Sequence, residues 1–139
     1  MLNKKMLRIV ICLIALFGCS SIGKSQCATD NEVIQTFITY PVFDDVFNPE
    51  IPGRIPLYIL KNKYINKGLQ LTRDDHVVKV VDDTTGLEKN YFEIVRLDMR
   101  SDTAQIAFYY ELKHLEVQGI VLNDEGKCKV EVNDYIFID

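Results

Sequence analysis

The two histidines of this chain, His76 and His114, are the side chains best suited to proton transfer near neutral pH. His76 follows Asp74 and Asp75, and these residue types occur together in metal and acid–base sites. Neighbours in sequence do not usually converge on one ion, so we interpret this stretch as a solvated turn. His114 stands beside Lys113 at an expected strand corner, where the sequence names no companion for a general base. Neither histidine predicts a catalytic site.

Three pairs of adjacent aspartates offer oxygen ligands for calcium: Asp44-Asp45, Asp74-Asp75 and Asp82-Asp83. A calcium loop needs ligands spaced as Asp-x-Asp-x-Asp-Gly, and the pairs lack that spacing. Asn123-Asp124-Glu125-Gly126 also carries oxygen atoms, but its composition is that of a hairpin turn. No glycine-rich phosphate loop, serine elbow or His-Glu-x-x-His motif occurs. We therefore expect no catalytic, cofactor-binding or metal-binding residues.

The first 18 residues have the layout of an export signal. Lys4, Lys5 and Arg8 precede an apolar run from Ile9 to Phe17. That run is shorter than the roughly 20 residues that a membrane-spanning helix needs, and its length suits a signal peptide. A buried core helix is disfavoured, because three cations precede a purely apolar run at the start of the sequence. We expect residues 1–18 to be a signal peptide.

Leu16-Phe17-Gly18-Cys19 resembles the lipobox of bacterial lipoproteins. The resemblance implies cleavage before Cys19, lipid attachment to its thiol, and a location in the bacterial cell envelope outside the cytoplasm. Two alternatives remain open. Cleavage after Ser25 would give a secreted protein, and an uncleaved segment would remain as an anchor. The membrane, reached through lipid on Cys19, is the first expected partner.

Charge sets limits on the other partners. Removal of residues 1–18 leaves 13 basic and 20 acidic residues, a net charge near −7. Basic residues are scattered singly among acidic ones, so we expect no nucleic-acid binding. An acidic surface is also repelled by anionic lipids, so the lipid rather than the protein surface would hold the chain at a membrane. A protein partner is possible and is not identified by the sequence.

Cysteine usage predicts one disulfide. Both cleavage schemes remove Cys12, and Cys19 is either lipidated or removed, so Cys27 and Cys128 remain. In an oxidising compartment these two are expected to pair, and the alternative is two free buried thiols. Closing a loop of about 100 residues is worth roughly 4–5 kcal/mol in the chain-entropy model. A metal or redox role would need clustered cysteines, which the sequence lacks.

Residues 19–29 are expected to form a lipidated tether ahead of a single domain over residues 30–139. Asp30 is positioned to cap a helix over Asn31–Thr39. Four apolar residues then form one stripe along that helix: Val33, Ile34, Phe37 and Ile38.

The segment from Tyr40 to Pro56 holds all four prolines, which predicts irregular backbone. Its apolar and aromatic residues indicate that it is packed, and long packed loops often carry binding functions. The simpler interpretation is that it covers one end of the core. For residues 57–65 we predict a helix from the spacing of Leu57, Leu60 and Tyr64, with a strand as the alternative. Short strands are expected over 69–71 and 77–81.

The last third of the chain predicts four β-strands, over 91–100, 103–113, 115–122 and 127–138. Period-two alternation is typical of half-buried antiparallel strands, and one parity of the second strand is apolar: Ala104, Ile106, Phe108, Tyr110 and Leu112. Tyr109 and Tyr110 are expected on opposite faces. The predicted fold class is α+β, with one or two short N-terminal helices packed on a curved antiparallel meander.

Residues 102–110, followed after a turn by Gly119-Ile120-Val121-Leu122 and Gly126-Lys127, resemble the cystatin-like and nuclear-transport-factor-like α+β superfamily. That resemblance implies a helix on a curved sheet, and the superfamily includes enzymes, binding modules and scaffolds. We expect a non-catalytic binding or structural domain. The alternative is an enzyme or small-ligand binder with a pocket between helix and sheet. Ionisable side chains converging in a cavity would favour the alternative. A filled interior with exposed apolar residues on segment 41–56 would favour partner binding.

Overall fold

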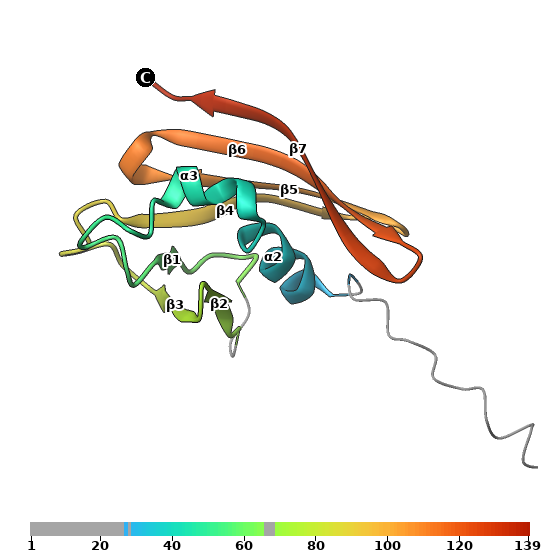
Figure 1. Ribbon diagram of the computed structural model, residues 1–139, viewed down its shortest axis with the longest axis horizontal. Coiled ribbons are helices and arrows are strands. Elements are labelled where there is room, and N and C mark those ends of the chain that lie inside the picture. The colour runs from blue at the N-terminus through green and yellow to red at the C-terminus, as the bar shows by residue number, and fades with distance from the viewer. Residues whose placement is uncertain (1–26, 28, 66–68) are drawn as a thin grey trace, which may run out of the picture.

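The computed structural model describes residues 27, 29–65 and 69–139 (Figure 1). The expected signal peptide, Cys19 and most of the expected tether lie outside the described residues. In the described part, two short helices and two 3-10 turns accompany a seven-stranded, curled, mixed sheet. The fold is therefore of the α+β kind.

Helix α2 spans Asp30–Ile38 and begins one residue earlier than predicted. Its N-cap is Thr29, not Asp30, because Thr29 and Glu32 form a reciprocal capping box. The predicted apolar stripe is confirmed, since all four of its residues are buried. Figure 1 shows α2 between the long strands and the β2–β3 hairpin, so the sheet curls around it.

The proline-rich segment is irregular but packed, as predicted. It contains a 3-10 turn, η1 (Pro41–Phe43), and a single-turn helix, α3 (Asp44–Phe47). Phe43, Val46 and Phe47 are buried. The segment ends in a cis peptide bond at Ile55-Pro56.

The sheet has the strand order β2-β3-β1-β4-β5-β6-β7. Its four long strands form the predicted antiparallel meander: β4 (Tyr91–Met99), β5 (Thr103–Tyr110), β6 (Leu115–Asp124) and β7 (Lys127–Phe137). A 3-10 turn, η2 (Glu111–Lys113), takes up the end of the predicted second strand. The short strands are β1 (Tyr58–Leu60), β2 (Leu71–Arg73) and β3 (His76–Val81). Because β1 is parallel to β3 and β4, the sheet is mixed, and the prediction of a purely antiparallel meander was wrong on this point.

The predicted helix over 57–65 was also wrong. Leu57 and Ile59 are buried at a spacing of two, which is the periodicity of a strand. Hydrogen bonds from Lys79 N to Leu57 O (3.0 Å) and from Lys61 N to Val81 O (2.8 Å) join this stretch to β3. A central position between two strands therefore overrides the helical spacing on which the prediction relied.

Aromatic rings fill the space between the helices and the sheet. Phe47 stacks on Phe108 with ring centroids 5.4 Å apart, and the edge of Phe37 meets Phe43 at 5.0 Å. Gly119 of β6 faces this cluster. A Cβ atom there would lie 2.6 Å from the Phe37 ring and 2.8 Å from the Glu131 carbonyl oxygen, so only glycine fits.

Candidate interaction surface

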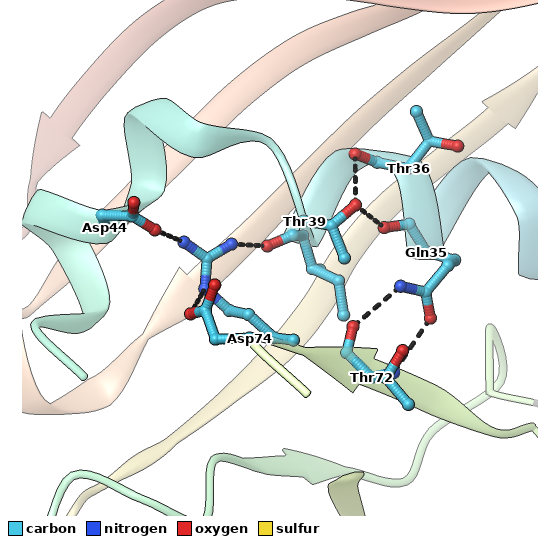
Figure 2. Close-up of polar contacts among 8 residues, drawn as sticks. Gln35, Thr36, Thr39, Asp44, Thr72 and Asp74 are labelled. Atoms are coloured by element: carbon cyan, nitrogen blue, oxygen red, sulfur yellow. Dashed lines mark hydrogen bonds and ion pairs between the residues drawn. The ribbon is translucent and has the colours of Figure 1, made fainter. Parts of the chain in front are cut away.

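Arg73 at the end of β2 is a buried cation, only 5% exposed. Its guanidinium donates hydrogen bonds to the carbonyl oxygen of Ile38, in the last turn of α2, and to the carboxylate of Asp44 in α3. It also lies 3.5 Å from a carboxylate oxygen of Asp74 and 5.1 Å from the Phe47 ring centroid. Figure 2 shows Asp44 and Asp74 approaching from two different segments. A cation at the carbonyl end of a helix is favourable, so this junction ties both helices to the hairpin.

Gln35 of α2 occupies the free edge of β2. Its side-chain amide donates to Thr72 O at 2.8 Å and accepts from Thr72 N at 3.0 Å (Figure 2). The amide thereby completes both backbone hydrogen bonds that a further strand would make at this residue. Proteins protect the edges of sheets in such ways, and here a helix side chain does it.

Asn90 and Tyr110 form a second buried polar junction. The Tyr110 hydroxyl donates to Asn90 Oδ1 at 2.8 Å and accepts from Arg54 at 3.2 Å. Asn90 Nδ2 donates to Arg54 O at 3.0 Å, with Gly53 O and Pro56 O each at 3.4 Å. Burial raises the pKa of Tyr110, and the hydrogen bond from Arg54 opposes that rise. The junction fixes the loop before β1.

An open cleft of about 350 Å³ lies beside this loop. Polar and apolar groups share its walls, and Arg54 and Glu88 contribute charge. The cleft lies outside the space between helix and sheet where the sequence placed a pocket, since aromatic rings fill that space.

The structure disperses the sequence candidates for chemistry. His76 is exposed, while Asp74 and Asp75 form a turn with positive φ angles of 49° and 60°. His114 Nδ1 lies 3.1 Å from the Tyr109 hydroxyl at the surface, away from His76. Among the described residues, no three His, Cys, Asp or Glu side chains gather as a metal site.

The acidic pairs belong to separate structural contacts. Asp44 pairs with Arg73, and Asp82 forms an ion pair with Lys61 at 2.8 Å. The backbone amide of Thr85 donates to Asp83, which lowers the pKa of that carboxyl. The predicted turn over 123–126 is confirmed, with Gly126 at φ 82°.

Two further predictions are confirmed by position. Tyr110 is buried, whereas Tyr109 lies on the other face opposite Glu93 and Glu116. The sulfur atoms of Cys27 and Cys128 lie at disulfide-bonding distance, with their Cα atoms 5.7 Å apart. The start of the described chain is thus beside β7.

Large exposed apolar side chains of the described residues occur in two segments, the proline-rich segment and the end of β7, and also on β3 (Val77 and Val80) and β4 (Val95 and Met99). Val42 and Ile51 of the proline-rich segment are 43% and 41% exposed, with Tyr40 close behind. The end of β7 exposes Tyr135, Ile136 and Phe137, the last at 72%, followed by Ile138. This second group departs from the half-burial that alternation predicts along the whole strand. Four consecutive apolar residues, from Tyr135 to Ile138, were the signal that alternation fails there.

Comparison of the chain with protein-family models, curated proteins and solved structures finds no match. Among the described residues, no helix is long and apolar enough to cross a membrane.

Proposed function

We propose that this chain is an exported lipoprotein, anchored to a bacterial envelope membrane by lipid on Cys19. The cations and apolar run of residues 1–18, followed by Leu16-Phe17-Gly18-Cys19, support the proposal. The net charge near −7 after cleavage supports anchoring by lipid rather than by the protein surface.

Intact mass of the membrane-extracted protein tests the anchor. We expect a chain that starts at Cys19 and carries added diacylglyceryl mass. A chain that starts at Gln26 without lipid would contradict the proposal in favour of secretion. A chain that keeps residues 1–18 would contradict it in favour of an uncleaved anchor.

For the domain itself we propose a non-catalytic role in binding another protein. One observation carries the proposal: rings fill the interior between helices and sheet, while large apolar side chains of segment 40–51 face solvent. Exposed apolar groups on a packed, proline-rich segment suit a protein partner. Their removal from water on binding is favourable, and the packed backbone loses little conformational freedom when the partner binds. The packing of α2 on the β4–β7 meander also supports the resemblance to cystatin-like folds, which remains a proposal.

Photo-crosslinking tests this role. The full chain is produced with p-benzoylphenylalanine in place of Val42 or Ile51, and adducts are identified by mass spectrometry. The control places the same group at Val77 of β3, which is 62% exposed and so more accessible than either test position. We expect discrete protein adducts at positions 42 and 51 and none at 77. Equal labelling at all three positions, or none at any, would contradict a binding role for this segment.

The cleft beside Arg54 favours one alternative, a domain that binds a small ligand. Its volume of about 350 Å³ lies at the lower end of the range for small-molecule sites. Native mass spectrometry of the purified protein tests this alternative. A retained small molecule that is lost in Arg54→Ala would support it, and an empty protein would leave partner binding as the better account.

A further inference from the structure

The two edges of the sheet differ in protection. At one edge, Gln35 fills the hydrogen-bonding groups of Thr72 in β2. At the other, β7 pairs with β6 alone among the described strands. Figure 1 shows the end of β7 at the outer margin of the molecule, beyond β6. A strand of this length with one open ladder is a ready template for another strand.

The two halves of β7 differ in character. The first half carries Lys127, Lys129 and Glu131, and Lys129 pairs with Glu131 at 3.3 Å. Charges along an edge discourage further pairing. A register shift follows, because Gln118 pairs with Asp134 and Gly119 with Val132, which leaves Asn133 as a bulge. Beyond the bulge and Asp134, the residues Tyr135, Ile136 and Phe137 expose apolar side chains on both faces of the strand. This second half is therefore better suited to pairing than the first.

We propose that the end of β7 binds a second copy of this chain, strand to strand and antiparallel, about a two-fold axis at Ile136. This register places Ile136 opposite its own counterpart on one face and Tyr135 opposite Phe137 of the second copy on the other. Aromatic and β-branched cross-strand pairs of this kind stabilise sheets. Two-fold dimers are also the commonest closed assembly of identical chains.

The apolar pattern of the strand end is self-complementary in this register, and its local charges are compatible with it. With the axis at Ile136, Asp134 lies opposite Ile138 of the second copy, and Asp139 lies opposite Asn133. No carboxylate faces another, whereas an axis at Asp134 would set two aspartates face to face. With the axis at Ile136, apolar groups meet apolar groups on both faces of the paired strands. A strand from another protein could make the same contacts only if it were also apolar on both faces. The proposal does not depend on the role of segment 40–51, because its strand-to-strand contacts are made by β7. The two surfaces adjoin, since burial raises the pKa of the Tyr135 phenol and Asp45 and Tyr40 lie near enough to add to that rise.

A charge swap at position 136 tests the axis. The full chain is extracted in mild detergent, with micelles in large excess so that two anchors do not share a micelle by chance. Protein mass is then measured by light scattering over a concentration series. We expect the wild-type chain to dimerise, and Ile136→Lys and Ile136→Glu each to weaken self-association about tenfold or more, because like charges then meet at the axis. We expect an equimolar mixture of the two variants to regain the dimer.

The matched control is the pair Val77→Lys and Val77→Glu on β3, which should leave the dimer unchanged. Circular dichroism and a thermal melt establish that each variant is folded. A wild-type chain that stays monomeric throughout would overturn the proposal, as would folded variants that dimerise like the wild type or a mixture that stays monomeric. The proposed binding role of segment 40–51 is tested separately by the crosslinking at Val42 and Ile51, whatever the outcome of the dimer experiment.

Discussion

At the scale of single residues, Arg73 decides how the helices meet the β2–β3 hairpin. Replacement by methionine leaves an apolar side chain beside Phe47 but removes the guanidinium, and with it the contact over the Phe47 ring and the hydrogen bond to the Ile38 carbonyl oxygen. We expect Arg73→Met to lower the free energy of unfolding by about 2–3 kcal/mol, measured by urea denaturation. Arg100→Met, at an exposed position, is the matched control and should cost less than about 0.5 kcal/mol.

The carboxylate partner should matter less than the cation. The Asp44 side chain is 56% exposed, so water screens its ion pair with Arg73. Asp44→Asn should therefore cost less than about 1 kcal/mol in the same urea experiment. Equal losses for Arg73→Met and Asp44→Asn would show instead that the ion pair, rather than the helix carbonyl, carries the stabilisation.

Tyr110 predicts a dependence of stability on alkaline pH. Burial raises the pKa of this phenol above its ordinary value of 10.0, so the folded chain keeps the proton at a pH where the unfolded chain loses it. The stabilisation is complete below about pH 10 and is lost as the pH rises through the folded pKa. We expect wild type to lose more unfolding free energy than Tyr110→Phe between about pH 9 and 11.5. Parallel curves would contradict the assignment, since the other tyrosines are common to both proteins.

The sequence located turns more readily than buried polar junctions. The acidic pairs and histidines lacked the spacing that chemistry requires, and the structure places them in separate turns and ion pairs. Arg73 and Asn90 could not be found in the same way. Their hydrogen-bond partners lie 20 to 37 residues away in sequence, and only tertiary packing brings them together.

At the scale of elements, the Gln35 contact predicts how β2 is held. Gln35→Ala removes both hydrogen bonds to Thr72 and should lower the unfolding free energy by about 1–2 kcal/mol. Gln35→Glu keeps an oxygen that accepts the hydrogen bond from Thr72 N. It loses the donor to Thr72 O and places a carboxylate oxygen next to that carbonyl oxygen. Hydrogen exchange at the Thr72 amide should therefore quicken strongly in the alanine variant and less in the glutamate variant. Gln70→Ala, an exposed glutamine just before β2, should leave the exchange rate unchanged.

Element prediction succeeded where the periodicity was long. Strands β4 to β7 span 8 to 11 residues, and residues 104, 106, 108 and 110 are all buried as their alternation indicated. Strand β1 has three residues, too few to separate strand from helix, and its place between β3 and β4 comes from long-range pairing. The shortest central element was therefore predicted wrongly, and β2 lies two residues later than the strand expected over 69–71.

At the scale of the whole molecule, charge and edge exposure act together. The chain after residue 18 has a net charge near −7, so two copies repel one another at long range. If β7 pairs as proposed, added salt should screen the repulsion while the apolar contacts persist. We expect the dimer dissociation constant to fall as the NaCl concentration rises from about 20 to 300 mM, measured by light scattering. A constant that rises with salt would indicate an interface held by ion pairs instead.

The contact of Cys27 with Cys128 spans 101 residues and joins the start of the described chain to β7. A bond across such a loop restricts the unfolded chain and should contribute about 4–5 kcal/mol in the chain-entropy model. Two free thiols would instead contribute only their separate packing. A double-mutant cycle separates these cases. If the two cysteines form a bond, either substitution removes its whole contribution to stability, whereas the losses from two independent thiols add.

We expect Cys27→Ser and Cys128→Ser each to lower the urea midpoint by the same large amount, and the double variant to lower it no further. The m-value should rise in all three, since an unfolded chain without the crosslink exposes more surface. Each single variant retains one free thiol, which is alkylated so that no intermolecular disulfide forms during the measurement. Reduction of the wild type should reproduce the stability of the double variant and add the mass of two hydrogen atoms to the intact chain. Additive losses, with no mass change on reduction, would identify two free thiols and leave the start of the domain held to β7 by packing alone.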